Sequence, residues 1–140
     1  MTPEKLVELA KEAMTHAYAP YSGFKVGAAL LCADGTVYQG CNIENASYGP
    51  TNCAERTAFF KAISEGDRDF ARIAIVGGME GTEADKPCAP CGVCRQVMNE
   101  FCDPDTFEII LADGKGGELV FTLKEMLPSV VGGIQFQAEA

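Results

Sequence analysis

The sequence predicts an α/β fold with a mixed sheet. Helical and strand patterns alternate along its 140 residues, in the order helix, two strands, helix, strand, helix, two strands and a short helix. A hairpin turn joins the first two strands, whereas helices separate the second strand from the third and the third from the fourth. With 47% hydrophobic and 22% charged residues, the chain has enough apolar material for one compact core. Because no internal repeat, linker or low-complexity segment divides it, we expect a single domain over residues 1–140.

The first half of the chain is expected to hold a helix, a hairpin and a second helix. Apolar residues recur at spacings of three and four between Leu6 and Ala17, which is the pattern of one buried helix face. A mostly apolar strand follows at 26–32, and an Asp-Gly pair supplies the turn to a second strand at 36–43. After a polar loop, residues 53–64 are predicted to form the second helix.

The second half of the chain is expected to add three strands and two helices. They are a strand at 72–77, a third helix with an inner face of Val93, Val97, Met98 and Phe101, strands at 107–112 and 118–122, and a short helix ended by Pro128. Cysteines stand at the predicted starts of the second and third helices.

The charge of the chain excludes some classes of partner. Eleven basic residues against 20 acidic ones give a net charge of −9, which disfavours binding to nucleic acid or to an anionic membrane. No apolar run approaches the roughly 20 residues needed to span a bilayer. The N-terminal residues are acidic where a signal peptide would be basic and then apolar, so we expect a cytoplasmic protein.

The chain has seven cysteines, an odd number that cannot be fully paired in one chain. Closely spaced cysteines in a chain with no export signal are more often metal ligands or catalytic groups than disulfides. Cys32, Cys41 and Cys102 lie in apolar segments, and we expect them to be small core residues.

Three other cysteines and a glutamate are expected to converge where two helices begin. Cys53 and Glu55 open one predicted helix, and Cys91 and Cys94 open another. Unpaired N–H groups at a helix start favour the thiolate, which is the form that binds a metal. Three thiolates suit Zn²⁺ and leave a fourth position for water, which is typical of a catalytic rather than a structural site.

Two conditions bear on this interpretation. Cys53 and Glu55 are two positions apart, roughly 200° around a helix, so both reach the metal only if Cys53 is the cap residue. Cys88 is a fourth candidate thiol that could close a four-cysteine structural site, although it precedes Pro90 in a loop. Glu55 is a general acid/base candidate because a carboxylate beside an activated water can take its proton.

The Cys-Ala-Glu and Pro-Cys-x-x-Cys motifs resemble the zinc nucleoside and nucleobase deaminases. Four further segments are similar to the small, homotetrameric cytidine deaminases: Tyr18-Ala19-Pro20-Tyr21-Ser22, Val26-Gly27-Ala28-Ala29-Leu30, Gly40-Cys41-Asn42-Ile43-Glu44-Asn45 and Cys94-Arg95-Gln96-Val97. The resemblance covers residues 5 to 128. It implies a three-layer α/β/α fold with a mixed five-stranded sheet and shared active sites in a homotetramer. It also implies zinc-dependent deamination of cytidine and 2′-deoxycytidine to uridine and 2′-deoxyuridine in pyrimidine salvage.

The resemblance assigns the metal chemistry to five residues. Cys53, Cys91 and Cys94 match the ligands of one zinc ion per chain. Glu55 matches the proton shuttle that activates water for attack on C4 of cytosine and then protonates the departing ammonia. Arg56 matches an arginine that hydrogen-bonds to ligand sulfurs, which would offset the net charge of −1 that three thiolates leave on Zn²⁺.

The resemblance also assigns the substrate contacts. Asn42 and Glu44 match the pair that holds the ribose 3′-hydroxyl, and their amide and carboxylate groups suit that role. Phe24 matches an aromatic residue of the pocket wall, and Ala54 is a further expected contact. Tyr48 matches a residue contributed by a neighbouring subunit.

One departure from the family pattern concerns the base. The family usually has a stacking phenylalanine three residues after the proline of the last helix, where this chain has Val131, so either Val131 or Phe136 is expected to complete the wall. Two alternatives to a cytidine deaminase remain at this point. One is a deaminase of a related cytosine nucleoside, such as an antibiotic nucleoside, and the other is a non-catalytic zinc protein.

Overall fold

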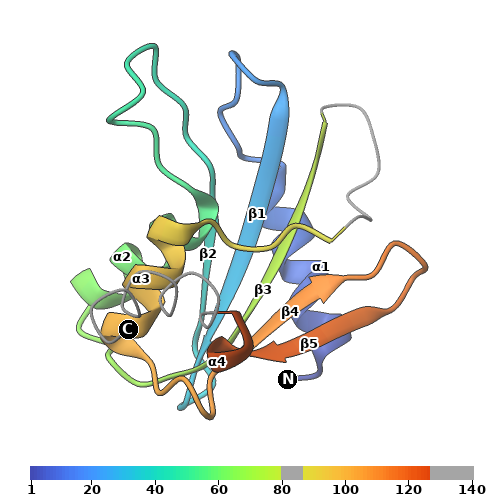
Figure 1. The fold of residues 1–140 in the computed structure, drawn as a ribbon, viewed down its shortest axis with the longest axis vertical. Coiled ribbons are helices and arrows are strands. Elements are labelled where there is room, and N and C mark those ends of the chain that lie inside the picture. Colours follow the sequence, from blue (N-terminus) through green and yellow to red (C-terminus); the bar gives the residue numbers. More distant parts are fainter. Residues whose placement is uncertain (80–86, 127–140) are drawn as a thin grey trace, which may run out of the picture.

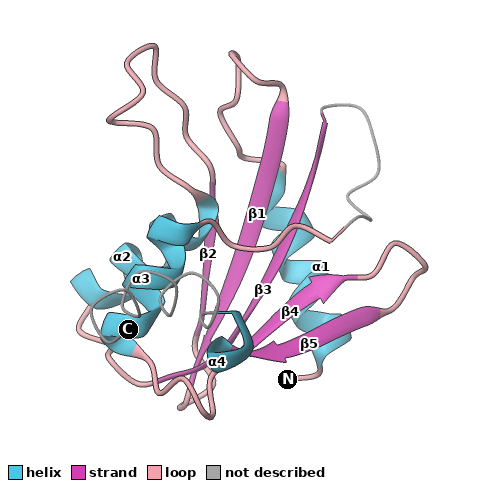
Figure 2. Cartoon of the chain, in the orientation of Figure 1, coloured by secondary structure: helices cyan, strands magenta, loops and turns pink. Residues whose placement is uncertain are grey.

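The computed structural model describes residues 1–79 and 87–126, and Figures 1 and 2 show their arrangement. In chain order the elements are α1 (Pro3–Met14), β1 (Phe24–Cys32), β2 (Val37–Cys41), α2 (Ala54–Ser64), β3 (Phe70–Met79), α3 (Gly92–Phe101), β4 (Glu108–Ala112), β5 (Glu118–Thr122) and α4 (Leu123–Met126). The order and type of every element agree with the prediction from the sequence.

The strands form one mixed five-stranded sheet in the order β2-β1-β3-β4-β5. β1 is antiparallel to both β2 and β3, and β5 is antiparallel to β4. β3 and β4 are parallel, so the chain must cross over between them, and α3 is the crossover helix. The predicted mixed sheet is confirmed.

Helices cover both faces of the sheet, which gives three layers. In Figure 1, α1 lies behind the sheet, and α2 and α3 lie in front of it. Successive residues of a strand point to opposite faces, so the central strands supply two separate cores. On the α1 side these strands contribute Ala29, Ala74, Val76 and Ile110. On the α2 and α3 side they contribute Ala28, Leu30, Ile73, Ile75, Ile109 and Leu111. The predicted α/β/α arrangement is confirmed.

Two glycines let the helices lie unusually close to the sheet. A Cβ atom added at Gly40 of β2 would lie 2.4 Å from the Ala54 carbonyl oxygen and 2.6 Å from the Ala58 nitrogen. A Cβ atom added at Gly27 of β1 would lie 2.0 Å from the Ala10 carbonyl oxygen. Gly40 therefore sets how closely α2 approaches the sheet, and with it the start of that helix.

The observed boundaries differ from the predicted ones where pairing or capping decides them. α1 ends at Met14, because the Thr15 N–H turns back to the carbonyl groups of Glu12 and Ala13. The predicted helix pattern up to Ala17 therefore runs past the real end. β1 and β3 are both longer than predicted because they pair along their whole length, from Phe24 opposite Met79 onwards.

Pro128, which was expected to end the last helix, lies outside the described residues. Within residues 1–79 and 87–126, no helix combines the length and the apolar character that crossing a bilayer demands.

Candidate active site

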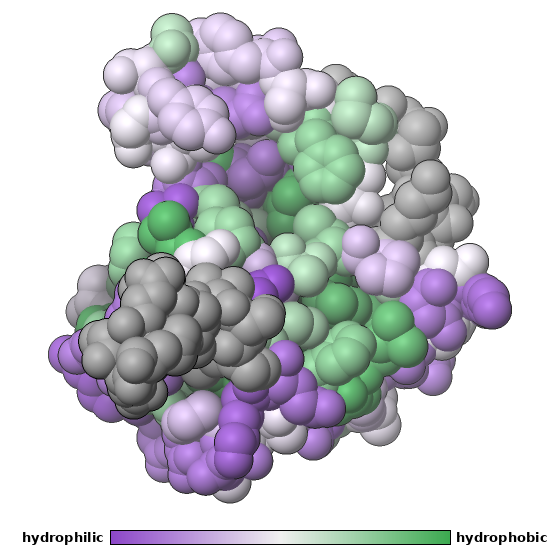
Figure 3. Space-filling view, viewed as in Figure 1, coloured by the Kyte–Doolittle hydropathy of each residue, from purple (hydrophilic) through white to green (hydrophobic). Residues whose placement is uncertain are grey.

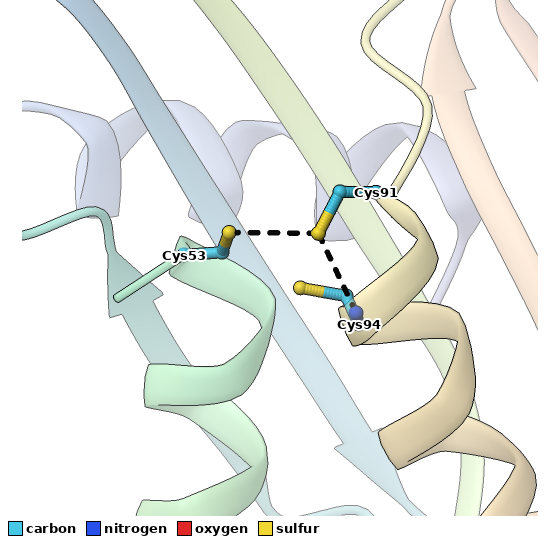
Figure 4. Close-up of side chains that lie close together, drawn as sticks. All are labelled: Cys53, Cys91 and Cys94. Atoms are coloured by element: carbon cyan, nitrogen blue, oxygen red, sulfur yellow. Dashed lines mark hydrogen bonds between the residues drawn. The ribbon is translucent and has the colours of Figure 1, made fainter. Parts of the chain in front are cut away.

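Two helix starts bring the three predicted thiols together, as Figure 4 shows. Cys53 is the N-cap residue of α2 and Cys91 is the N-cap residue of α3, both with extended backbone. Cys94 lies in the first turn of α3, and its backbone N–H donates to Cys91 Sγ at 3.4 Å. The condition that Cys53 must be a cap residue is therefore met.

The sulfur geometry fits a tetrahedral metal. The sulfur atoms of Cys53, Cys91 and Cys94 all lie within 4.8 Å of one another, and the Cys53 and Cys91 sulfurs are 3.7 Å apart. Two sulfurs at about 2.3 Å from one Zn²⁺ in tetrahedral geometry would be about 3.8 Å apart. A disulfide would need about 2.05 Å. The chemistry and spacing of the donors thus fit zinc. Cys88 is not part of this three-thiol group.

The pKa values of two thiols in the group are shifted in opposite directions. A hydrogen bond from Cys94, together with others from Arg56 and Cys91, lowers the pKa of Cys53 to about 5. The same interaction, with burial, raises the pKa of Cys94 well above its usual range. The site therefore holds one thiolate readily even before a metal displaces the remaining protons.

Arg56 places a permanent positive charge beside this cluster. Its Nη2 atom donates to Cys53 Sγ at 3.3 Å, and this bond raises the pKa of the guanidinium further. Its Nε–H is buried and has no hydrogen-bond partner among the described residues. A guanidinium that donates to Cys53 Sγ stands where it can offset negative charge on the thiols.

Glu55 is held out of water at the start of α2. Only 4% of its surface is exposed, and burial raises the pKa of its carboxyl group to about 7, helped by the nearby Cys53 thiolate. A carboxyl group with a pKa near neutrality can both accept and release a proton at neutral pH. This is the property expected of a general acid/base.

A pocket of about 200 Å³ opens in front of Glu55 and the thiols. Its polar lining includes Asn42, Glu44, Asn52, Glu55, Cys53 and Cys91, and Ala54 and Cys88 also line it. In Figure 3 the surface is hollowed beneath the projecting loop that joins β2 to α2. A carboxyl group, thiols and hydrogen-bonding amides thus face one cavity, and a few such polar groups in a pocket are typical of a small-molecule site.

Asn42 binds the backbone at the start of β1, and Glu44 binds the backbone of the turn before it. Asn42 accepts from the Val26 N–H at 2.9 Å and donates to the Phe24 carbonyl oxygen at 2.9 Å. Glu44 accepts from the N–H groups of Tyr21 and Ser22 at 2.9 and 3.0 Å. Hydrogen bonds from Ser22, first the hydroxyl and then the N–H, hold the pKa of Glu44 below its usual value.

The other predicted contacts lie farther from the metal group. Phe24 is 37% exposed and is not among the residues that line the pocket. Its ring packs near Gly77, where an added Cβ atom would lie 3.0 Å from the Phe24 ring and 2.9 Å from Cys88 Sγ. Tyr48 is 91% exposed in the loop between β2 and α2. Val131 and Phe136 lie outside the described residues.

The structure adds polar residues that the sequence analysis did not single out. Asn52 lines the pocket and donates to the Thr57 hydroxyl, which lies within hydrogen-bond distance of the carbonyl groups of Cys41 and Cys53. Arg95 donates to the Pro90 carbonyl oxygen at 2.9 Å and fixes the turn before Cys91. Asn52 directly precedes Cys53 and Arg95 directly follows Cys94. This proximity in sequence could have indicated that both residues lie near the site.

Comparison with known proteins agrees with this geometry. Residues 1–109 match the model of the cytidine and deoxycytidylate deaminase zinc-binding region. The chain belongs to this deaminase family. Within the described residues, the Cys53, Cys91 and Cys94 group is the one that could hold the zinc for which the family region is named.

Relatives across the deaminase family cover most of the chain. A cytidine deaminase of Sporosarcina psychrophila is 52% identical over 128 residues, which are 91% of this chain and 90% of that protein. The crystal structure of cytidine deaminase from Burkholderia pseudomallei superposes with a TM-score of 0.81 at 53% identity, covering 92% of this chain and 98% of that one. A blasticidin-S deaminase of Bacillus cereus is 33% identical over 127 residues, 89% of this chain and 88% of that protein.

Proposed function

We propose that this protein is a cytidine deaminase that hydrolyses cytidine and 2′-deoxycytidine to uridine and 2′-deoxyuridine with release of ammonia. The observation that carries the proposal is the placement of a buried carboxyl group, Glu55, beside three thiols at the paired starts of α2 and α3. Family membership and the 52% identity to a cytidine deaminase support the same activity.

The chemistry divides between the metal and the side chains around it. When bound by Cys53, Cys91 and Cys94, zinc supplies Lewis acidity that lowers the pKa of water and makes it a nucleophile near neutral pH. Glu55 takes the proton from the water that attacks C4 of the cytosine ring. It later delivers a proton to the departing amino nitrogen, which leaves as ammonia. Arg56 hydrogen-bonds to Cys53 Sγ and offsets the excess negative charge of three thiolates.

Asn42 and Glu44 retain the capacity to bind a ribose hydroxyl. The Asn42 amide uses one N–H and one oxygen lone pair on the backbone of β1, which leaves one of each free for a ligand. Glu44 offers about four acceptor positions and uses three on Tyr21 and Ser22. The remaining position can accept from the 3′-hydroxyl of a nucleoside.

The substrate is a free nucleoside rather than a polynucleotide. A net charge of −9 gives the chain no basic groove along which a phosphate backbone could track. At the ribose 3′ position, the Glu44 carboxylate would repel the phosphate that a polymer carries there. A hydroxyl, by contrast, can donate to this carboxylate.

The active unit is a homotetramer whose sites are completed by neighbouring copies. Tyr48 supports this assembly because its ring is 91% exposed in a single chain, in a surface pocket that it shares with Glu44 and Thr51, and is therefore accessible to a neighbouring copy. Exposed Tyr18, Tyr21 and Ile43 add apolar surface that a neighbouring copy could cover. We also propose that the protein is cytoplasmic, and that its reaction belongs to pyrimidine salvage, as the resemblance to the small cytidine deaminases implies.

A second candidate substrate is an antibiotic nucleoside of the blasticidin type. The 33% identity to a blasticidin-S deaminase supports it. The higher identity to a cytidine deaminase, and the polar pair Asn42 and Glu44 suited to an unmodified ribose, favour cytidine.

The deciding experiment measures ammonia release by the zinc-loaded protein from three substrates at low salt. They are cytidine, blasticidin S and an oligonucleotide with a single cytosine. We expect efficient turnover of cytidine alone. Preferential turnover of blasticidin S would assign the protein to the antibiotic branch, and comparable turnover of the oligonucleotide would assign it to polynucleotide editing. No turnover of any of them by a zinc-loaded chain would favour a non-catalytic zinc protein.

A further inference from the structure

A single hydroxyl group connects the Glu44 carboxylate to the backbone of Phe24. Ser22 Oγ donates to Glu44 Oε2 at 2.5 Å and accepts from the Phe24 N–H at 3.0 Å. Glu44 lies 22 positions later in the sequence, at the wall of the pocket. The serine hydroxyl therefore links a carboxylate of the pocket wall to the first residue of β1 through two hydrogen bonds.

The segment around Ser22 depends on this carboxylate for its shape. Glu44 Oε1 accepts from the N–H groups of both Tyr21 and Ser22, and the Glu44 N–H donates to the Tyr18 carbonyl oxygen at 2.8 Å. Gly23 follows with φ +71°, a conformation that side chains rarely adopt, and so turns the chain into β1. The Glu44 carboxylate thus binds the turn that leads to Phe24, which is also closed by a hydrogen bond from the Gly23 N–H to the Ala19 carbonyl oxygen at 2.9 Å.

The other side of the Phe24 backbone is held by Asn42. Its Nδ2 atom donates to the Phe24 carbonyl oxygen at 2.9 Å, while its Oδ1 accepts from the Val26 N–H. The Phe24 N–H is therefore bound by Ser22, which is itself bound to Glu44, and the Phe24 carbonyl group is bound by Asn42. Together with the pairing of Phe24 and Met79 between β1 and β3, both contacts fix the backbone from which the Phe24 ring projects.

We propose that Ser22 is a positioning residue for substrate binding, because it couples the Glu44 carboxylate to the placement of the Phe24 ring. The proposal rests on the proposed function, in which Asn42 and Glu44 bind the ribose, and on the family resemblance, which implies that Phe24 forms part of the nucleoside site. Ser22 itself touches neither the thiol group nor Glu55 in the described contacts, so its effect falls on binding rather than on proton transfer.

Removing the hydroxyl leaves most of the turn in place. In Ser22→Ala, the backbone N–H groups of residues 21 and 22 still donate to Glu44 Oε1. The Phe24 N–H loses its acceptor, and Glu44 Oε2 loses its donor. Ser22→Thr keeps the hydroxyl, and the additional methyl group falls at an exposed position.

The test compares zinc-loaded wild type, Ser22→Ala and Ser22→Thr in the deamination of cytidine. Ser22→Ala should raise KM about tenfold, the effect of about 1.4 kcal/mol, while kcat stays within about twofold. Zinc content and the thermal midpoint should be unchanged. Ser22→Thr should restore most of the KM. The matched control is Ser64→Ala at the far end of α2, where the hydroxyl donates only to the Lys61 carbonyl oxygen in the described contacts.

A double-mutant cycle separates positioning from a general structural effect. If Ser22 acts through Phe24, adding Ser22→Ala to Phe24→Ala should change KM by less than about twofold. Full additivity of the two substitutions would overturn the proposal. So would an unchanged KM in Ser22→Ala, or a loss of kcat and thermal midpoint that Ser22→Thr does not restore. If wild type does not turn over cytidine, both the proposed function and this inference are wrong. If wild type is active and the Ser22 variants behave otherwise than expected, this inference alone is wrong.

Discussion

Glu55 shows how one residue acquires an unusual acidity from its neighbours. It occupies the first turn of α2, where unpaired N–H groups normally favour a charged carboxylate. Burial outweighs that effect and raises the pKa to about 7. The carboxyl group can therefore exist in either protonation state at neutral pH, as a proton shuttle requires.

Replacing the carboxyl group by an amide tests this role. Glu55→Gln preserves the size of the side chain but cannot carry a proton, so kcat should fall at least about 1000-fold while the protein keeps one zinc ion and its fold. Ammonia release and metal analysis of the same sample measure both effects. Glu65→Gln, at the exposed end of the same helix, is the control and should behave as wild type. Substantial turnover by zinc-loaded Glu55→Gln would assign proton transfer to another group.

Cys88 and Cys91 distinguish an open metal site from a closed one. Cys91 belongs to the three-thiol group, whereas Cys88 packs near Gly77 on the pocket wall. We expect Cys88→Ser to retain about one zinc ion per chain and Cys91→Ser to lose most of it. Metal content after dialysis decides the matter. Equal loss in the two variants would indicate a structural site with four thiolates.

The metal group was predictable from sequence because its geometry is local. Cys53 and Cys91 each precede a helical pattern, so they were expected to stand at helix starts, and Cys94 follows within one turn. The hydrogen bonds of the Ser22 hydroxyl were not predictable, since they depend on the Glu44 carboxylate 22 positions later and on the turn that this carboxylate binds. The roles of Phe24, Asn42, Glu44 and Tyr48 in substrate binding stay predictions.

At the level of elements, the contact between β2 and α2 fixes the position of the helix that carries Glu55. Gly40→Ala should lower the free energy of unfolding by about 1–3 kcal/mol, because the new methyl group would meet the α2 backbone at Ala54 and Ala58. Denaturation by urea of the zinc-loaded protein measures it. Gly49→Ala, where an added Cβ has no neighbour within 4 Å, should stay within about 0.5 kcal/mol of wild type. Equal stability of the two variants would contradict the tight packing of α2.

Elements were easier to predict than their ends. Short apolar runs at 26–32 and 72–77 indicated the type of β1 and β3, but the full length of these strands emerges only from pairing with each other, which no local pattern contains. The end of α1 was overestimated because apolar residues continue after the backbone leaves the helix at Thr15. Tertiary contacts and capping, rather than propensity, set these boundaries.

At the level of the whole molecule, exposed aromatic residues around the pocket bear on assembly. We expect light scattering to give a mass about four times the 14.9 kDa of one chain. Tyr48→Ala should raise KM without dissociating the tetramer, because the ring is proposed to reach a neighbouring site. A fully active monomer would remove both the assembly and this role of Tyr48. The prediction of one domain over residues 1–140 also remains to be tested.

The separation of the metal ligands along the chain has a consequence for folding. Cys53 and Cys91 stand 38 positions apart, and α2, β3 and the start of the crossover to β4 lie between them. A metal that binds both cysteines closes a long loop. As long as it remains bound to them in the unfolded chain, it reduces the conformational entropy of that chain. By analogy with a disulfide of that loop length, this restriction amounts to about 4 kcal/mol. Removing zinc with a chelator should therefore lower the thermal midpoint by about 10 °C, which calorimetry can measure. The ion that serves the reaction would then also act as a cross-link that holds the two halves of the fold together.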